Sequence, residues 1–297
     1  MASQPESHAS TKDDTADVSI SASADSSGAS NLPDGCTSIR WGEDPVTVCR
    51  WWERPKLPQC YRYHLINIFL PHRLQCSMNI HVPRFLARID LPSSDPGAVH
   101  PALINAMCLI ACGLLAPEPL AAPLAALEAQ FIKETRFHLP LSLALADRLI
   151  DFLMASCLLG WYYAGKGRLT EAHLALASAS RFAAGCGLHQ ISSRSVEALE
   201  AQRDRGSRSL LGPPADSLEL AERINAFWMA FLIDRTISMG TNWPAAFSDE
   251  EIETVLPACY SKFESDSTAD LPNITQSRCG SQVHSAPLSC FAAGNQF

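Results

Sequence analysis

The chain has 297 residues, of which 47% are hydrophobic and 18% are charged, so it has enough apolar material for a large buried core. Its net charge of −8 argues against nucleic-acid binding through bulk electrostatics, because neutralising phosphates needs an excess of Lys and Arg. The N-terminus shows neither the basic start nor the apolar stretch of a secretory signal, so the 11 cysteines are expected to be free thiols in a reducing, intracellular compartment.

The first part of the chain, residues 1–57, is predicted to be a disordered and irregular leader. Residues 1–33 are rich in serine and poor in large apolar side chains, so they cannot bury enough surface to offset the entropy of ordering. From residue 58 onwards, apolar residues recur at helical spacing, and Pro71 is expected to end or bend this first helix. One or two helical turns are predicted for residues 83–89.

A loop is predicted for residues 90–100, and the helix that follows should begin at Pro101 and run to about residue 115. Residues 121–134 should be helical, and Pro140 is expected to break this helix. Residues 142–164 are predicted to form a single long apolar helix. After a glycine turn at residues 165–167, residues 169–184 should form its antiparallel partner.

The apolar runs at residues 102–116 and 149–164 are shorter than a membrane-spanning helix, and Asn105 and Asp151 interrupt them. They are therefore interpreted as buried core helices, and no membrane association is expected.

Polar residues 190–216 are predicted to form a long flexible loop. Asp216 is a suitable N-cap for an amphipathic helix that runs to about Met239. Residues 258–297 are expected to be an irregular tail. Because no comparable run alternates with a period of two, the sequence predicts an all-α domain of antiparallel helix pairs over residues 58–257.

The cysteines do not follow a zinc-binding pattern. The chain has no Cys-x-x-Cys pair, and Cys108 and Cys112 share a helical face that is otherwise Ile, Leu and Ala. Two further pairs, Cys60 with His64 and His72 with Cys76, could in principle complete a tetrahedral site. Pro71 changes the chain direction between these pairs, however, so we predict no metal and no cofactor.

Catalytic signatures are also missing from the sequence. It contains no Gly-x-Ser-x-Gly elbow and no His-Glu-x-x-His motif. Residues 165–168 (GKGR) lack both the preceding strand and the Lys-Ser/Thr ending of a phosphate-binding loop. The sequence therefore does not predict an enzyme.

Two stretches carry a family resemblance. The first is LLGWYYAGKGRLTEA at residues 158–172 with ASRFAAGCGLH at 179–189. The second is ERINAFWMAFLIDR at residues 222–235, followed by Trp243-Pro244, SDEEI at 248–252 and Leu256-Pro257. In this order and spacing, they resemble the middle regulatory domain of fungal zinc-cluster transcription factors, of the fungal-specific or xylanolytic-activator type. The resemblance covers residues 58–257.

The resemblance implies a nuclear regulator of transcription whose helical domain contacts co-regulators or a dimer partner. In that family an N-terminal six-cysteine cluster binds two zinc ions and reads DNA. The cluster has no counterpart in this sequence, so the resemblance carries over neither DNA binding nor zinc to any residue. Because residues 258–297 also lack the resemblance, we expect a truncated, spliced or imperfectly predicted gene product.

Four charged residues interrupt apolar helix faces and are the candidate site residues: Arg181, Arg223, Asp234 and Arg235. Charged groups in such places are normally paired, so we predict a buried or half-buried ion-pair network with a structural role.

The sequence also allows two other functions. The spacing of Gly160, Tyr163, Gly167 and Ala172 is similar to one tetratricopeptide unit of a helical-repeat scaffold, although only one such unit is present. A helical enzyme or small-molecule sensor would instead have a pocket lined by Trp161, Tyr162 and Trp228.

Overall fold

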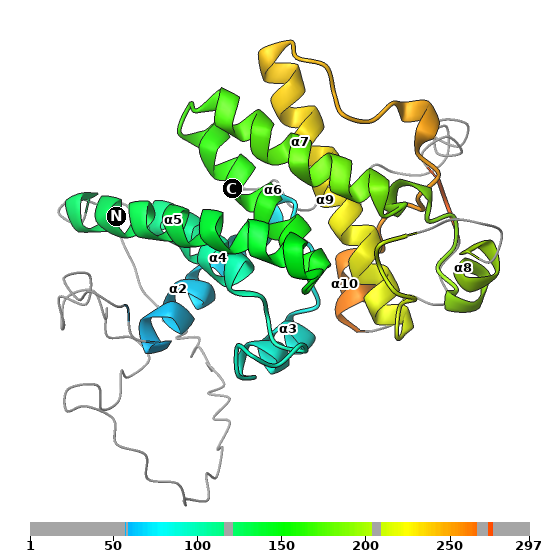
Figure 1. Ribbon diagram of the computed structural model, residues 1–297, viewed down its shortest axis with the longest axis horizontal. Helices are drawn as coiled ribbons and strands as arrows, with labels where there is room; N and C mark the ends of the chain where they lie inside the picture. Colours follow the sequence, from blue (N-terminus) through cyan, green and yellow to red (C-terminus); the bar gives the residue numbers. More distant parts are fainter. Residues whose placement is uncertain (1–56, 58, 116–120, 204–208, 266–272, 276–297) are drawn as a thin grey trace, which may run out of the picture. The chain divides into compact units, whose positions relative to one another are not determined.

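A computed structural model describes residues 57, 59–115, 121–203, 209–265 and 273–275, all within the unit formed by residues 50–297. The described residues form helices and no β-sheet, apart from one isolated antiparallel bridge between Val255 and Thr275 (Figure 1). The α-helices are α2 (Gln59–His72), α3 (Val82–Ile89), α4 (Pro101–Leu114), α5 (Ala121–Leu145), α6 (Leu149–Gly165), α7 (Leu169–Gly185), α8 (Val196–Arg203), α9 (Ser217–Thr241) and α10 (Tyr260–Glu264). The all-α prediction is confirmed.

The core forms around α6, which packs against α4, α5, α7 and α9. Helices α6 and α7 form an antiparallel pair, α9 packs against both, and α4 contacts α2, α5 and α6 (Figure 1). The apolar runs on α4 and α6 are buried almost all round, and Asn105 and Asp151 are buried with them. None of the helices in the described segments is long and apolar enough to cross a membrane.

Several helix ends lie where local chemistry predicted them. Asp216 caps α9, because its Oδ1 accepts a hydrogen bond of 2.6 Å from the backbone N–H of Glu219. Gly167 and Gly187 follow α6 and α7 with φ angles of 73° and 70°, a left-handed conformation that costs glycine no steric strain. The predicted α6–α7 hairpin is therefore confirmed.

The prediction that Pro140 breaks its helix is wrong. Helix α5 continues through Pro140 to Leu145. Proline removes the hydrogen bond to the carbonyl four residues earlier, which belongs to Arg136. Both residues are exposed, so water can hydrate that carbonyl and the helix tolerates the loss.

The predicted single helix over residues 142–164 is also wrong, because the chain turns between α5 and α6. Ala146 and Arg148 adopt left-handed φ angles of 50° and 45°. Ser142 holds this turn, since its Oγ donates to the carbonyl of Asp147 at 2.5 Å and its carbonyl accepts from the N–H of Asp147 at 2.9 Å. Nothing in the local sequence marks this turn with glycine or proline.

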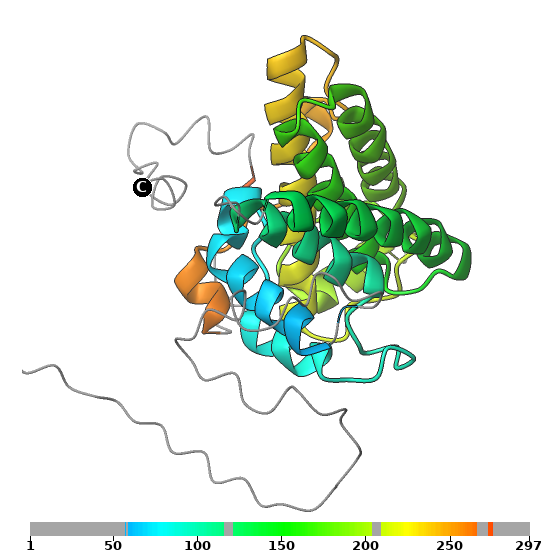
Figure 2. The ribbon, with the colours of Figure 1, turned by 90° about the vertical axis from the view of Figure 1, so that its left-hand side faces the viewer.

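Two segments expected to lack regular structure contain short helices. Helix α8 lies within the predicted loop of residues 190–216, and Ser195 Oγ accepts a hydrogen bond from Ala198 N–H at its start. Helix α10 lies within the predicted irregular tail, and Phe263 on it is fully buried against Ala221 and Ala258. In Figure 2, α10 (orange) lies near the end of α2, where Arg73 contacts Tyr260 and Glu264. The predicted leader lies outside the described residues, apart from the buried Leu57.

Candidate functional site

A cavity of about 490 Å³ lies among α3, α6 and α9. Three short segments bring charged side chains to its walls: Arg84 and Arg88 from α3, Arg148 and Asp151 from the start of α6, and Glu219, Glu222 and Arg223 from α9. The rest of the wall is largely apolar. Its size is within the range of pockets that hold small organic molecules.

Arg88 on α3 and Arg148 at the start of α6 are each bound by an aspartate. Arg88 Nη2 lies 2.8 Å from Asp151 Oδ2, which also accepts a hydrogen bond of 2.8 Å from the backbone N–H of His100. Arg148 donates to both carboxylate oxygens of Asp147, at 2.9 and 2.6 Å. Asp151 is only 2% exposed, so these partners take the place of the water that its carboxylate loses on burial.

The other two arginines are bound by carboxylates at the start of α9. Arg84 Nη1 lies 2.9 and 3.2 Å from the two carboxylate oxygens of Asp216. Arg223 donates through Nε to Glu219 Oε1 at 3.1 Å and through Nη1 to the carbonyl of Gly212 at 2.7 Å. Each arginine of the cavity thus has a carboxylate of its own.

Glu222 also lines the cavity, but none of the four arginines forms a hydrogen bond with its carboxylate. Its nearest charged partner is Arg84 Nε, at 3.8 Å, and it accepts no hydrogen bond from any residue that the structure describes. Burial raises the pKa of Glu222 from its ordinary value of 4.5 to about 7, although the positive charges of Arg84 and Arg88 lower it. Glu222 is therefore a poorly compensated acid in the cavity wall.

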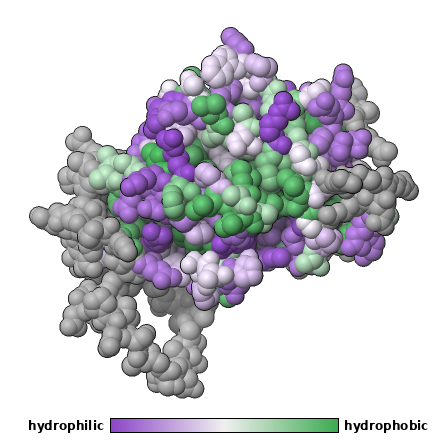
Figure 3. All heavy atoms as spheres, viewed as in Figure 1, coloured by the Kyte–Doolittle hydropathy of each residue, from purple (hydrophilic) through white to green (hydrophobic). Residues whose placement is uncertain are grey.

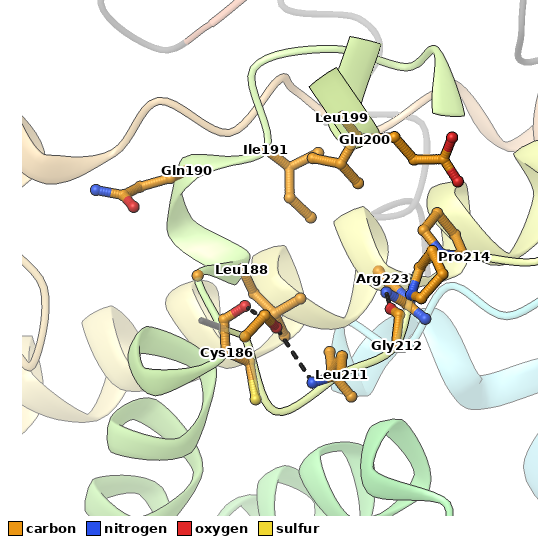
Figure 4. Close-up of a pocket in the computed structure, with 13 residues that line it drawn as sticks. Cys186, Leu188, Gln190, Ile191, Leu199, Glu200, Leu211, Gly212, Pro214 and Arg223 are labelled. Atoms are coloured by element: carbon orange, nitrogen blue, oxygen red, sulfur yellow. Dashed lines mark hydrogen bonds between the residues drawn. The ribbon is translucent and has the colours of Figure 1, made fainter. Parts of the chain in front are cut away.

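A smaller cavity of about 90 Å³ shares Leu211 and Arg223 with the first one (Figure 4). Its lining is mainly apolar and includes Cys186. Ser209 closes one side by donating from Oγ to the carbonyl of Cys186 at 2.8 Å. Burial raises the pKa of Cys186 to about 11, so this thiol stays protonated and unreactive at neutral pH.

The four predicted ion-pair residues are not brought together as one network. Arg223 pairs with Glu219, as described above. Arg235 pairs with Asp249 Oδ1 at 2.5 Å and donates to the carbonyl of Phe247 at 2.7 Å. Buried Asp234 accepts from the backbone N–H of Ala246 at 2.8 Å, and burial raises its pKa.

Arg181, the fourth residue, is exposed on α7 and forms no ion pair with a described residue. Sequence reasoning did not select Glu222, Arg84 or Arg88. The available signal for Glu222 was its position three residues after Glu219 on the helix predicted to be amphipathic.

The aromatic residues proposed for a sensor pocket have other roles. Tyr162 donates to Glu128 Oε2 at 2.9 Å, and Trp228 donates from Nε1 to the carbonyl of Val255 at 2.7 Å. Both side chains are packed in the core, and Trp161, next to Tyr162 in sequence, is half-buried. None of the three lines either cavity described above.

Among the described residues, five buried cysteine thiols are poor zinc ligands, whereas the thiol of Cys259 is exposed and its hydrogen bonds with the backbone N–H of Lys262 and with Ser261 lower its pKa. Cys76, Cys108, Cys112, Cys157 and Cys186 are buried, and burial raises the pKa of each thiol, which disfavours the thiolate that zinc requires. No group of three or more His, Cys, Asp or Glu residues suited to a metal occurs in the described segments. The side chain of Cys60, which the sequence pairs with His64, lies outside them.

Comparison with known proteins gives a family match over most of the chain. The model of the fungal specific transcription factor domain matches residues 66–292. That match continues past residue 257, where the sequence resemblance was expected to end. No solved structure matches at a significant level.

Several curated relatives match a short segment. A citrinin biosynthesis transcriptional activator of Monascus ruber is 42% identical over 53 residues, which are 18% of this chain and 10% of the relative. A pigment biosynthesis transcriptional activator of the same species is 38% identical over 52 residues, and an ascochitine biosynthesis cluster transcriptional regulator of Didymella fabae is 38% identical over 58 residues. These segments cover 18% and 19% of the chain and 9% and 10% of the relatives, so the aligned part is about a tenth of each relative's length.

Proposed function

The chain belongs to the family of fungal specific transcription factor domains, and from this premise we propose that it regulates transcription in the nucleus through contacts with other proteins. Its helical domain is the regulatory domain of a fungal transcription factor. This family is not a family of enzymes, and the observation that carries the proposal is the family match over residues 66–292. The match favours a transcription regulator over a tetratricopeptide scaffold.

The relatives suggest which genes such a regulator controls. Their names connect them with the biosynthesis of citrinin, a pigment and ascochitine. We therefore propose that the regulator to which this chain contributes acts on a cluster of biosynthetic genes for a small organic product.

The proposed mode of action is binding to co-regulators or to a dimer partner. The net charge of −8 does not favour contacts with phosphates, so we assign no DNA contact to the described residues. Hydrophobic residues gather in the middle of the face shown in Figure 3, surrounded by hydrophilic ones. Among the residues that the structure describes, the most exposed large hydrophobic side chains, on any face, are those of Met239, Leu145, Leu210, Leu174 and Phe137. Exposed apolar surface of this kind supports protein contacts.

A reporter assay tests this proposal. The chain is fused to a heterologous DNA-binding module and expressed in a fungal strain whose reporter gene carries the module's binding site. We expect reporter transcription to differ from that with the module alone, and a fluorescent fusion of the chain to accumulate in the nucleus.

An unchanged reporter together with a non-nuclear fusion protein would contradict the proposal. Strong sequence-specific DNA binding by the isolated chain in a gel-shift assay would instead overturn the proposed protein-contact mode.

A further inference from the structure

In the larger cavity, every arginine is hydrogen-bonded to a carboxylate, but the carboxylate of Glu222 has no hydrogen-bond donor among the described residues. Arg84, Arg88, Arg148 and Arg223 are each held by a carboxylate within hydrogen-bond distance. An anionic ligand would have to compete with these carboxylates for every arginine. Glu222, by contrast, has no hydrogen-bond donor among the described residues, so the wall offers an acceptor that lacks a donor.

A second acceptor in the same wall also lacks a donor. The Oδ1 atom of Asn79 is buried and has no hydrogen-bond partner in the described part of the chain. The carbonyl of Asn79 accepts a hydrogen bond of 3.1 Å from Asn225 Nδ2. The Oδ1 atom of Asn79 is too deeply buried for a molecule in the cavity to reach it, whereas the side chain of Glu222 is 17% exposed. Glu222 is therefore the acceptor that such a molecule can reach.

The remaining wall is suited to an apolar body. Ile80, Phe85, Leu149, Met154 and Leu211 all line this cavity and are at most 8% exposed. A pocket that combines such a lining with a few polar groups is typical of small-molecule sites.

We propose that this cavity binds a small organic molecule with an apolar body and a protonated amine, and that Glu222 accepts a hydrogen bond from the ammonium group. The ammonium supplies the positive charge and the donors that Glu222 lacks, while the apolar body lies against the hydrophobic wall. This inference goes beyond the proposed function, and binding can be measured on the isolated chain whether or not the chain regulates transcription.

A pair of matched probes tests the proposal by calorimetry on the purified full chain. Tryptamine carries an indole ring and an ammonium group, and indole-3-propionic acid carries the same ring and a carboxylate. At about pH 8, where Glu222 and the ammonium group are both charged, we expect tryptamine to bind and the acid to bind at least about tenfold more weakly.

Two changes should weaken tryptamine binding specifically. Glu222→Gln keeps the size of the side chain and removes its charge, so we expect the affinity for tryptamine to fall about tenfold or more. Glu250→Gln is the control, because Glu250 is exposed in the turn Asp249–Glu251, and it should leave the affinity unchanged.

Lowering the pH to about 5.5 should weaken tryptamine binding to the unchanged protein, because Glu222 takes up a proton while the amine stays charged.

The pH series does not depend on whether the Glu222→Gln variant folds. The proposal is overturned if tryptamine does not bind or if its affinity is the same at both pH values. It is also overturned if a folded Glu222→Gln protein binds tryptamine as tightly as the unchanged chain, or if the acid binds as well as the amine.

Discussion

At the scale of single residues, burial decides how much an ion pair contributes to stability. Arg223 and Arg168 each pair with a glutamate close in sequence, Glu219 and Glu171. The side chain of Arg223 is 9% exposed, whereas that of Arg168 is 41% exposed. Water therefore screens the second pair, while loss of the first leaves the Oε1 atom of Glu219 and the carbonyl of Gly212 without the donor that Arg223 supplies.

We expect Arg223→Ala to lower the free energy of unfolding by about 2–3 kcal/mol and Arg168→Ala to lower it by less than about 1 kcal/mol. Urea unfolding followed by circular dichroism measures both values. Equal and small losses for the two variants would show that Arg223 is not a structural residue, and the prediction made for it from the sequence would then be wrong.

Because the pKa of Glu222 is raised in the folded chain, the free energy of unfolding depends on pH. The pKa is about 7 in the folded chain and near its ordinary 4.5 in the unfolded chain. Between these two values, the folded state binds more protons than the unfolded state, so stability falls as the pH rises. The charged groups that face Glu222 are Arg84 and Arg88 on α3, Asp151 on α6 and Glu219 on α9.

Glu222→Gln removes this titration and is compared with the unchanged chain across the same pH range. We expect the variant to gain about 2–3 kcal/mol relative to the unchanged chain between about pH 4.5 and 7, with no further gain above that range. Denaturant unfolding at a series of pH values gives the difference. A difference that stays constant with pH would mean that Glu222 does not titrate in this window.

At the scale of helices, Gly160 sets how closely α6 and α7 approach each other. A Cβ atom at Gly160 would lie 2.9 Å from Cγ and 3.1 Å from Cδ2 of Leu176 on α7. These distances are shorter than van der Waals contact, so a larger residue has to push the two helices apart or move Leu176.

Gly160→Ala is therefore expected to lower stability by about 1–2 kcal/mol, even though alanine is the better helix former. Gly113→Ala is the matched control, because Gly113 also lies in a helix and a Cβ there meets nothing within 4 Å. The control should be neutral or slightly stabilising. Thermal unfolding of both variants tests this contrast, and a stabilised Gly160→Ala protein would contradict it.

The helices also show which features are readable from local sequence. The starts of α4 and α9 and the ends of α6 and α7 were predicted, because Pro101, Asp216, Gly167 and Gly187 act within one or two turns of themselves. The turn between α5 and α6 was missed, since it rests on the hydrogen bonds between Ser142 and Asp147 rather than on turn-forming residues.

At the scale of the whole molecule, the cavity was not predictable because its wall comes from distant segments. Arg88 and Asp151 are 63 residues apart and meet at 2.8 Å, and Arg84 and Asp216 are separated by 132 residues. Arg223 was selected as a paired charge, and its carboxylate partner lies four residues away on the same helix. The backbone N–H that binds Asp234 could not be read from a pattern of charges.

The family match and the fold also bear on where the domain ends. Residues 258–297 were predicted to be an irregular tail, but α10 connects back to the start of the helical domain. Arg73, directly after α2, contacts Glu264 Oε1 at 3.1 Å and also Tyr260. Phe263, between them, is completely buried and stacks edge-on against His81 at 5.8 Å between ring centroids. These contacts place α10 in the same folding unit as α2 and α9.

If α10 belongs to that unit, Phe263→Ala should cost about 3–5 kcal/mol in a single unfolding transition, because it leaves a cavity in the core. Phe137→Ala is the control, since Phe137 is 62% exposed on α5 and its loss should cost less than about 0.5 kcal/mol. Calorimetry of both variants measures the size and the number of transitions. A Phe263→Ala protein as stable as the control would restore residue 257 as the end of the domain, because the segment after it would then contribute no core.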